Sequence, residues 1–190
     1  NVIDELHPEF PVDIYSANKV VSEKYMLVYA HAYGMHVVVV RLGNVYGPRS
    51  NIRSPDFGFM NYFVGLGLQG KTLTVFGDGA QQRTVTYVDD AVRALTMAAV
   101  DEAAAGEVFF AVSDCQLTVR EIADTIAATI GGEVASVEWP RERQSIEIGD
   151  ARISNSKIRR LLGWEPQWDL ARGLAATREY YADCLEEYVD

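Results

Sequence analysis

The chain has 190 residues, of which 48% are hydrophobic and 11% aromatic, so it can bury a sizeable core in one or two domains. Its formal net charge of −10 and its pI near 4.8 argue against a broad basic surface for nucleic acid or anionic lipid. Any anionic ligand must therefore be met by individually placed arginines.

Helices are predicted from their N-terminal signals and from apolar periodicity. Ser54 and Pro55 have the residue types of a cap and a first helical position, Asp89 is a candidate cap, and Thr118 with Glu121 fits a capping box. Glycines follow several of the predicted ends. The predicted helices cover residues 13–33, 54–70, 89–100, 118–130, 156–162 and 169–188.

Strands are predicted between most of these helices. Residues 35–42 form a nearly continuous β-branched run, which is typical of a strand buried on both faces of a parallel sheet, and residues 43–51 read as a loop. The turn 77–79 separates two shorter strands. The predicted strands cover residues 35–42, 71–76, 83–88, 107–112 and 133–139. This alternation predicts an α/β architecture with a layered sheet.

Cysteine and histidine are sparse. Cys115 and Cys184 are too few for a disulfide framework, which favours a reducing cytoplasm. The three histidines form no ligand spacing with them, so no metal site is predicted. No run of about 18 apolar residues occurs, and the sequence indicates neither a membrane span nor a secretory signal.

Tyr15 and Lys19 carry the clearest chemical signal. Four residues apart on the first predicted helix, the two side chains lie on one face, where the Lys19 ammonium can stabilise a phenolate. A free phenol, with a pKa of about 10, accepts protons poorly at neutral pH unless a cation favours its ionised form. The pair therefore suits proton removal from a sugar hydroxyl, although a tyrosine packed on a lysine stem gives the same pattern.

Three further segments follow in order. They are residues 41–49 (RLGNVYGPR), residues 75–90 (VFGDGAQQRTVTYVDD), and residues 146–150 (IEIGD) continuing to residues 162–166 (LGWEP). With Tyr15-x-x-x-Lys19 they resemble the extended short-chain dehydrogenase/reductases, specifically the NAD-dependent nucleotide-sugar epimerases and dehydratases. The resemblance covers essentially the whole chain.

The resemblance implies the C-terminal part of a Rossmann-type doubly wound parallel sheet plus a smaller α/β substrate-binding domain. Residues 1–49 and 81–112 would form the first unit, and residues 50–80 and 113–190 the second. The Gly-rich segment that holds the NAD pyrophosphate in the family has no match here. The chain is therefore expected to be the C-terminal portion of an enzyme and inactive alone.

The resemblance also implies site residues. Tyr15 matches the catalytic base, and Lys19 matches the residue that tunes it and binds the nicotinamide ribose. Asn44 matches an amide near the substrate phosphates, Arg83 an arginine on the pyrophosphate, and Arg143 a second clamp. Val75 and Gly77 are expected to line the base pocket. The same sequence pattern also fits purely structural roles. Asn44 would then be a turn residue, Arg83 a solvent-exposed residue of a strand, and Val75 the end of an ordinary strand.

The implied activity is an NAD-dependent nucleotide-sugar 4-epimerase that oxidises the sugar transiently at C4. There are two kinds of alternative. One is a nucleotide-sugar 4,6-dehydratase or a decarboxylase of the same family, and the other is a non-catalytic sugar-nucleotide-binding or assembly module. The expected partners are a nucleotide-diphosphate sugar and an N-terminal polypeptide. A homodimer or larger oligomer is also expected, because apolar side chains surround most of the helix at residues 13–33.

Overall fold

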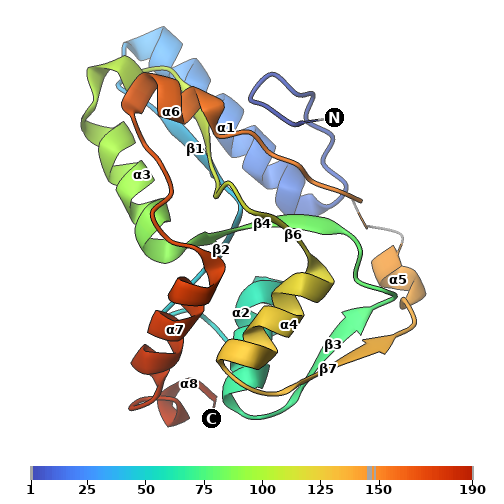
Figure 1. Ribbon diagram of the computed structural model, residues 1–190. Helices are drawn as coiled ribbons and strands as arrows, with labels where there is room; N and C mark the ends of the chain where they lie inside the picture. The colour runs from blue at the N-terminus through green and yellow to red at the C-terminus, as the bar shows by residue number, and fades with distance from the viewer. Residues whose placement is uncertain (1, 145–146, 148, 190) are drawn as a thin grey trace.

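The computed structural model describes residues 2–144, 147 and 149–189 and forms an α/β structure (Figure 1). The strands are β1 (Val39–Leu42), β2 (Asn44–Tyr46), β3 (Thr72–Phe76), β4 (Gln82–Tyr87), β5 (Val108–Ala111), β6 (Gln116–Thr118) and β7 (Glu133–Val137). The helices are α1 (Ile14–Tyr33), α2 (Phe59–Leu68), α3 (Val88–Val100), α4 (Val119–Thr129), α5 (Arg141–Gln144), α6 (Ser156–Leu162), α7 (Leu170–Tyr181) and α8 (Glu186–Val189), with short 3₁₀ turns at Pro55–Phe57 and Glu102–Ala104.

Local capping signals predict several of these boundaries correctly. Thr118 and Glu121 form the predicted capping box at the start of α4, with the Glu121 carboxylate accepting from the Thr118 backbone N–H at 2.8 Å. Gly34 and Gly163 end α1 and α6 in the left-handed conformation, at φ of 64° and 65°. These ends are set by residues adjacent in sequence, so the pattern suffices to find them.

Several predicted boundaries are wrong, and the predicted strand at residues 35–42 begins only at Val39. The expected loop after β1 contains β2, which pairs in parallel with β4. Gly58 takes a φ of 112° and separates the 3₁₀ turn at Pro55–Phe57 from α2, so the second helix begins later than predicted. Asp89 is not a cap: Tyr87 holds the cap position of α3, and Asp89 lies exposed in its first turn.

The predicted terminal helix is also interrupted. Helix α7 ends at Tyr181, and the chain turns before α8 begins at Glu186. This turn returns Tyr188 to the end of α7, where its hydroxyl lies 2.9 Å from that of Tyr180 and its ring centroid lies 4.9 Å from that of Tyr181. The aromatic cluster accounts for the break, because a continuous helix would carry Tyr188 away from it.

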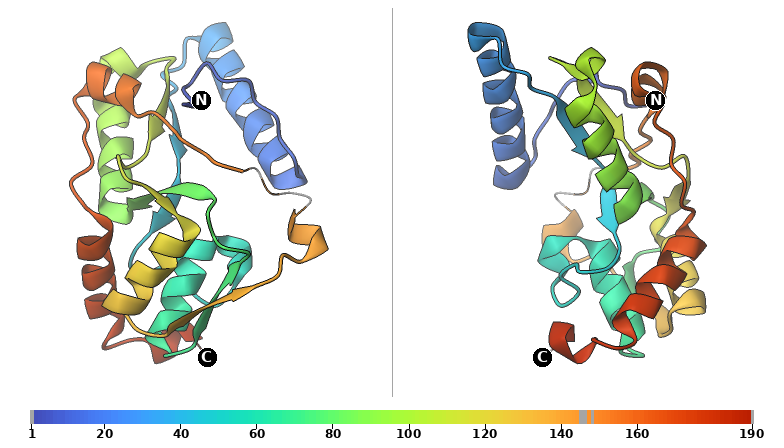
Figure 2. Two further views of the ribbon diagram at one scale, coloured as in Figure 1. Left: turned by 45° about the vertical axis from the view of Figure 1, so that its right-hand side comes forward. Right: turned by 90° about the vertical axis from the view of Figure 1, so that its left-hand side faces the viewer.

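In the described part of the chain the strands form three small sheets, and their pairing is mainly parallel. β1 pairs with β5, β2 with β4, and β3 with β7 in parallel, whereas β6 joins β4 antiparallel. Figure 2 shows α1 on one side of the β1–β5 pair, with α3 and α6 on the other. Helices on both sides of a parallel pair are the arrangement of a doubly wound fold.

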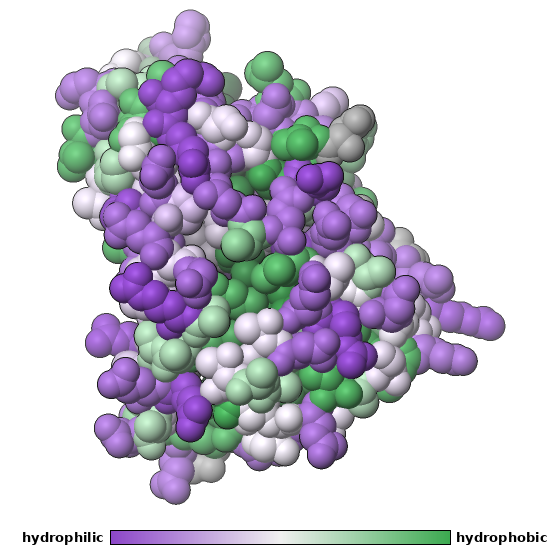
Figure 3. Space-filling model, viewed as in Figure 1, coloured by the Kyte–Doolittle hydropathy of each residue, from purple (hydrophilic) through white to green (hydrophobic). Residues whose placement is uncertain are grey.

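Two hydrophobic cores support this arrangement. One packs α2, α4 and α7 around β3 and β4 and includes Phe63, Leu73 and Ile122. The other packs α3 and α6 around β1 and β5 and includes Phe109 and Trp164. Helix α6 therefore packs with the β1–β5 pair, although the sequence grouped it with the second unit. Figure 3 shows apolar residues near the middle of one face, close to β6, with hydrophilic residues around them.

The segment around β1 is less buried than predicted. Only Val37 is buried in residues 35–42, and the residues of β1 are half-buried or exposed. No residue of α1 is buried either; a stripe that includes Val20, Leu27 and Ala30 is half-buried. A strand that is buried on both faces needs side chains packed against each face, and the described residues do not provide them for β1.

A cluster of charged side chains joins α1 to β1. The Arg41 guanidinium donates to both Glu23 carboxylate oxygens, at 2.9 and 2.7 Å, and also to Glu9. Lys24 donates to Glu9 at 2.8 Å and to Glu23 at 3.0 Å. The hydrogen bond from Arg41 lowers the pKa of the Glu23 carboxyl from 4.5 to about 2.

A pH-dependent loss of stability is expected from this cluster. Because folding lowers the pKa of Glu23, its contribution is full above about pH 4.5 and is lost as the pH falls toward about 2. Glu23→Gln is expected to lower the melting temperature at pH 7 and to flatten its fall between pH 4.5 and 2. Thermal unfolding followed by circular dichroism measures both, with Glu186→Gln on α8 as the exposed control. An unchanged pH profile in Glu23→Gln would contradict this expectation.

Candidate active site

Tyr15 lies in the first turn of α1, at an end fixed by Asp13. The Asp13 carboxylate accepts from the Ser16 backbone N–H at 2.7 Å, and the Ser16 hydroxyl completes a capping box. The Lys19 Nζ lies 5.4 Å from the centroid of the Tyr15 ring, so the two side chains share one face of the helix. Tyr15 is 70% exposed and Lys19 is exposed, so a ligand can reach both polar groups.

Asn44 and Arg83 lie on neighbouring strands. Asn44 begins β2, and its amide Nδ2 donates to the Thr84 backbone oxygen on β4 at 2.9 Å. Arg83 precedes Thr84 on β4. The parallel pairing of β2 with β4 therefore places these two predicted phosphate contacts close together in the fold.

The Arg83 guanidinium is held by the segment that precedes α6. Its Nη1 donates to the backbone oxygens of Gln82 and Gly149, at 2.8 and 2.6 Å, and its Nη2 donates to the Glu147 carboxylate at 2.5 Å. Nearby, the Asp150 carboxylate accepts from the Gln82 backbone N–H at 2.9 Å. An anion bound by Arg83 must therefore compete with Glu147 or share the guanidinium with it.

Glu147 is the site residue that sequence reasoning missed. It stands in the IEIGD segment used for the family resemblance, but nothing in that string shows that a carboxylate faces Arg83, 64 residues earlier in the chain. The Arg83 side chain is only 14% exposed, and a charge so far removed from water needs an opposite charge or hydrogen-bond acceptors around it. The need for such a partner was the one signal in the sequence that could have pointed to a carboxylate at this site. Only the fold identifies Glu147 as the carboxylate that pairs with Arg83.

Val75 and Gly77 mark the end of β3. The Val75 side chain is buried in the core and faces away from solvent, so only its backbone can border a ligand. Gly77 adopts a φ of 62°, and a Cβ there would lie 2.8 Å from Nε1 of Trp139. The Phe76 and Trp139 ring centroids lie 5.3 Å apart, so the absence of a side chain at Gly77 allows the Trp139 indole to pack closely against the end of β3.

Arg143 lies on the short helix α5, and its side chain is outside the described part of the structure. Figures 1 and 2 show the first turn of α1 on the same side of the molecule as α5. Within the described residues, no hydrogen bond or ion pair joins Tyr15 or Lys19 to Asn44 or Arg83. The structure thus brings the predicted residues together in pairs rather than in one closed site.

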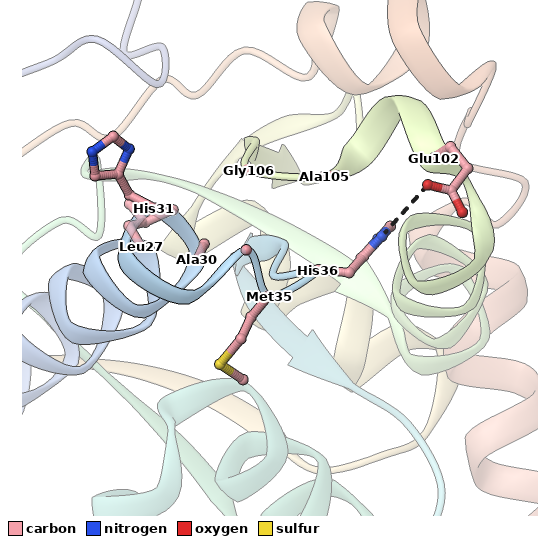
Figure 4. A pocket seen from close by; sticks show the side chains of 9 residues that line it. Leu27, Ala30, His31, Met35, His36, Glu102, Ala105 and Gly106 are labelled. Atoms are coloured by element: carbon pink, nitrogen blue, oxygen red, sulfur yellow. Dashed lines mark ion pairs between the residues drawn. The ribbon is translucent and has the colours of Figure 1, made fainter.

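An open cavity of 660 Å³ lies at the opposite end of α1, bordered by the last turn of α1 and by the segment before β5 (Figure 4). Leu27 and Ala30 line it from α1, and the His36 imidazole lies 3.9 Å from the Glu102 carboxylate beside it. Among the described side chains, those of Tyr15, Lys19, Asn44, Val75 and Arg83 do not border this cavity, nor does Gly77. It is therefore distinct from the Tyr15 region.

Comparisons with known proteins give consistent matches. A profile of the NAD dependent epimerase/dehydratase family matches residues 3–142. The chain is 33% identical to a UDP-glucose 4-epimerase from Mycolicibacterium smegmatis, over 92% of this chain and 54% of that protein. It is 32% identical to a dTDP-glucose 4,6-dehydratase from Actinoplanes sp., over 93% of this chain and 53% of that protein. The chain thus spans about half the length of these curated relatives.

Two solved structures support the fold assignment. One is a UDP-glucose 4-epimerase with UDP-glucose from Thermotoga maritima, which superposes with a TM-score of 0.85 at 29% identity and covers 96% of this chain and 58% of its own. The other is a dTDP-glucose 4,6-dehydratase from Streptomyces venezuelae solved with NAD, with a TM-score of 0.84 at 29% identity, covering 99% of this chain and 56% of its own. The matched region is the C-terminal portion of a Rossmann-type fold.

Proposed function

Because this chain belongs to the NAD-dependent epimerase/dehydratase family, we propose that it is the C-terminal portion of a nucleotide-sugar 4-epimerase with Tyr15 as its base. The observation that carries the proposal is the Tyr15–Lys19 pair. Both side chains are exposed in the first two turns of α1, with the ammonium 5.4 Å from the ring. A phenolate stabilised by a neighbouring cation can accept a proton and, as the phenol, return it, which reversible oxidation of an alcohol requires.

In this mechanism the Tyr15 phenolate, stabilised by the Lys19 ammonium, takes the proton of the sugar C4 hydroxyl and becomes the neutral phenol. The exposed Tyr15 hydroxyl and Lys19 ammonium fit the ribose end of a nicotinamide cofactor, since they offer a donor/acceptor and a donor to its hydroxyls. NAD, when bound, supplies the hydride acceptor. The relatives' additional length is the proposed source of the remaining cofactor contacts.

The substrate side of the site rests on Arg83, Asn44 and Gly77. The planar Arg83 guanidinium can pair with two oxygens of a pyrophosphate, and Asn44 lies one strand away. Gly77 and the Val75 backbone are proposed to border the base, next to the Phe76 and Trp139 rings, on which a flat base can stack. We assign a nucleoside-diphosphate sugar as substrate on this basis, and Arg143 as a second phosphate contact from its place on α5.

A nucleotide-sugar 4,6-dehydratase is the second candidate. It is favoured by the relatives of that name, whose identities to this chain equal or approach those of the epimerases. The two activities share C4 oxidation, so Tyr15 and Lys19 serve either. A decarboxylase or a non-catalytic binding module would use the same surface around Arg83. A cytoplasmic location is also proposed, on the ground that the chain has only two cysteines, Cys115 and Cys184, and both are free.

The test is turnover by the full gene-encoded protein with NAD⁺ and either UDP-glucose or dTDP-glucose. Nuclear magnetic resonance of the products separates the C4 epimer expected of an epimerase from the 4-keto-6-deoxy sugar expected of a dehydratase. Formation of the keto sugar would replace the first candidate with the second. Tight sugar-nucleotide binding without either product would favour the binding module.

Arg83→Ala is expected to weaken nucleotide-sugar binding by about 1.5–3 kcal/mol, since it removes a charge-assisted hydrogen bond to phosphate. Glu147→Gln is expected to tighten binding, because the phosphate then no longer competes with a carboxylate for the guanidinium. Calorimetric titration of the full protein measures both. Arg120→Ala, which removes a surface ion pair with Asp124, is the matched control. An unchanged dissociation constant in Arg83→Ala would show that Arg83 does not bind the substrate and has only a structural role.

The oligomeric state follows from the outward faces of α1. Large apolar side chains on this helix are exposed, among them Val21, Tyr25, Val28 and Tyr29. Exposed apolar area of this kind marks an interaction surface. We expect a homodimer or larger oligomer, and sedimentation over a concentration series measures it. A monomer of 21.1 kDa at tens of micromolar would contradict the expectation.

A further inference from the structure

Helix α1, which carries the proposed catalytic base, has little buried surface to fix its position. None of its residues is buried, and the stripe that includes Val20, Glu23 and Leu27 is only half-buried. Contacts between apolar side chains are non-directional, so such a stripe does little to prevent the helix from rotating or sliding over its neighbours. A defined position for Tyr15 therefore requires a directional contact elsewhere on α1.

The directional contacts of α1 lead to one distant side chain, Arg41 on β1. Within the described residues, hydrogen bonds from α1 to other segments start from Glu23 and Lys24. Lys24 donates to Glu9, which belongs to the segment that leads into α1. Glu23 accepts from Nε of Arg41 at 2.9 Å and from its Nη2 at 2.7 Å. In the described part of the chain, Arg41 is thus the one side chain beyond α1 to which this helix is hydrogen-bonded.

The contact between Glu23 and Arg41 has two points and is shielded from water. Two N–H···O bonds from one planar guanidinium fix both the distance and the relative orientation of the two groups. The Arg41 and Glu23 side chains are 18% and 10% exposed, so solvent screens this pair less than a surface ion pair. The Arg41 guanidinium also lies 5.3 Å from the centroid of the Phe110 ring, a contact that ties it to β5.

Glu23 follows Tyr15 and Lys19 along the same side of α1. The three residues are four positions apart, so each is rotated by about 40° from the one before it, and Glu23 lies about 12 Å along the axis from Tyr15. Hydrogen bonds between successive turns join these positions into one body. A rotation or shift of the helix at Glu23 therefore reaches the Tyr15 hydroxyl.

Arg41 connects this helix to the strands that carry the proposed phosphate contacts. Asn44 follows Arg41 by three residues and begins β2. β2 pairs in parallel with β4, which contains Arg83. The contact between Glu23 and Arg41 is therefore a direct connection between the helix of the proposed base and the strands of the proposed substrate site.

We propose that Glu23 and Arg41 are positioning residues for the base: their two-point contact sets the rotation and height of α1 and so places the Tyr15 oxygen against the sugar hydroxyl. This inference rests on the proposed function of Tyr15. The alternative is an ion pair that only stabilises the fold. The two roles differ when the charge at Arg41 is kept and its planar fork is removed, because a lysine ammonium is a point charge that does not fix orientation.

Arg41→Lys in the full gene-encoded protein makes this change. With NAD⁺ and UDP-glucose or dTDP-glucose, well below the melting temperature, it is expected to lower kcat by at least about 10-fold, since a misplacement of about 1 Å can cost 10²-fold. KM for the nucleotide sugar is expected to stay nearly unchanged, because the proposed phosphate contacts remain. The pH profile of kcat/KM is expected to keep its position, because Tyr15 and Lys19 lie on one helix and move together.

Arg93→Lys is the matched control. Arg93 also pairs with a carboxylate, that of Asp90, but it belongs to α3, which lies on the other side of the β1–β5 pair from α1 (Figure 2). This variant is expected to lower the melting temperature and to leave kcat unchanged. A normal kcat in Arg41→Lys, or an equal fall of kcat in both variants, would overturn the proposal.

Tyr15→Phe in the same assay separates this inference from the proposed function. Low turnover in Tyr15→Phe with normal turnover in Arg41→Lys would overturn the positioning role and leave Tyr15 as the base. Near-normal turnover in Tyr15→Phe would overturn both. If Arg41→Lys does not fold, Glu23→Asp, which keeps the charge and withdraws the carboxylate by one methylene, is judged by the same changes in kcat, KM and pH profile.

Discussion

Tyr15→Phe is expected to lower the turnover number of the full-length protein by 10²-fold or more while leaving the KM for the nucleotide sugar nearly unchanged. The change removes the proton acceptor but keeps the ring, and a positioned general base contributes about 10²–10⁴-fold. The Lys19 ammonium lies 5.4 Å from this ring, so the phenylalanine retains the cation–π contact and the local packing. The loss therefore reports on the hydroxyl itself.

Tyr25→Phe is the matched control, because Tyr25 is an exposed tyrosine on the same helix, 65% accessible compared with 70% for Tyr15. Its turnover is expected to equal that of the unmodified protein. Steady-state kinetics with both variants separates kcat from KM. Near-normal turnover in Tyr15→Phe would show that Tyr15 is not the catalytic base. Equal losses of turnover in both variants would indicate a structural effect on α1.

The largest effect on stability is expected at Asp90. Its side chain is 1% exposed and accepts hydrogen bonds from the Gln167 and Trp168 backbone N–H groups, at 2.9 and 3.0 Å, and from Arg93 at 2.6 Å. Asp90→Ala leaves these donors without an acceptor inside the protein, which costs about 3–5 kcal/mol by analogy with broken buried ion pairs. This single carboxylate joins α3 to the segment that leads into α7.

Urea unfolding of the purified chain measures the effect as a fall in the midpoint concentration. Asp89→Ala is the matched control: the neighbouring carboxylate is exposed in the first turn of α3 and is expected to contribute at most about 1 kcal/mol through the helix dipole. A loss in Asp90→Ala no larger than that in Asp89→Ala would show that the buried hydrogen bonds do not set the stability.

These adjacent aspartates show where sequence reasoning succeeds and where it ends. The sequence predicts that an acidic residue starts α3, and it selects Asp89 as the cap. The structure instead leaves Asp89 exposed and places Asp90 against Gln167 and Trp168, 77 and 78 residues later. Two identical side chains next to each other cannot be told apart by local propensity, because their roles depend on a distant segment.

What the sequence determined by itself is the local and periodic part of the structure. The capping box of Thr118 and Glu121 and the shared face of Tyr15 and Lys19 depend on residues within four positions of each other. The α/β class follows from the alternation of such locally recognisable helices and strands along the chain. The motif order also sufficed to identify the family, which the profile match over residues 3–142 confirms.

Only the tertiary structure decided how distant segments meet. It formed β2 within the expected loop by pairing Asn44 with Val85 on β4, and it bent the C-terminal helix so that Tyr188 could join Tyr180. It placed Glu147 on Arg83 and closed one edge of the β1–β5 pair with Glu5 and Lys157. These contacts have no local signature, since long-range pairing depends on which surfaces the folded chain brings together.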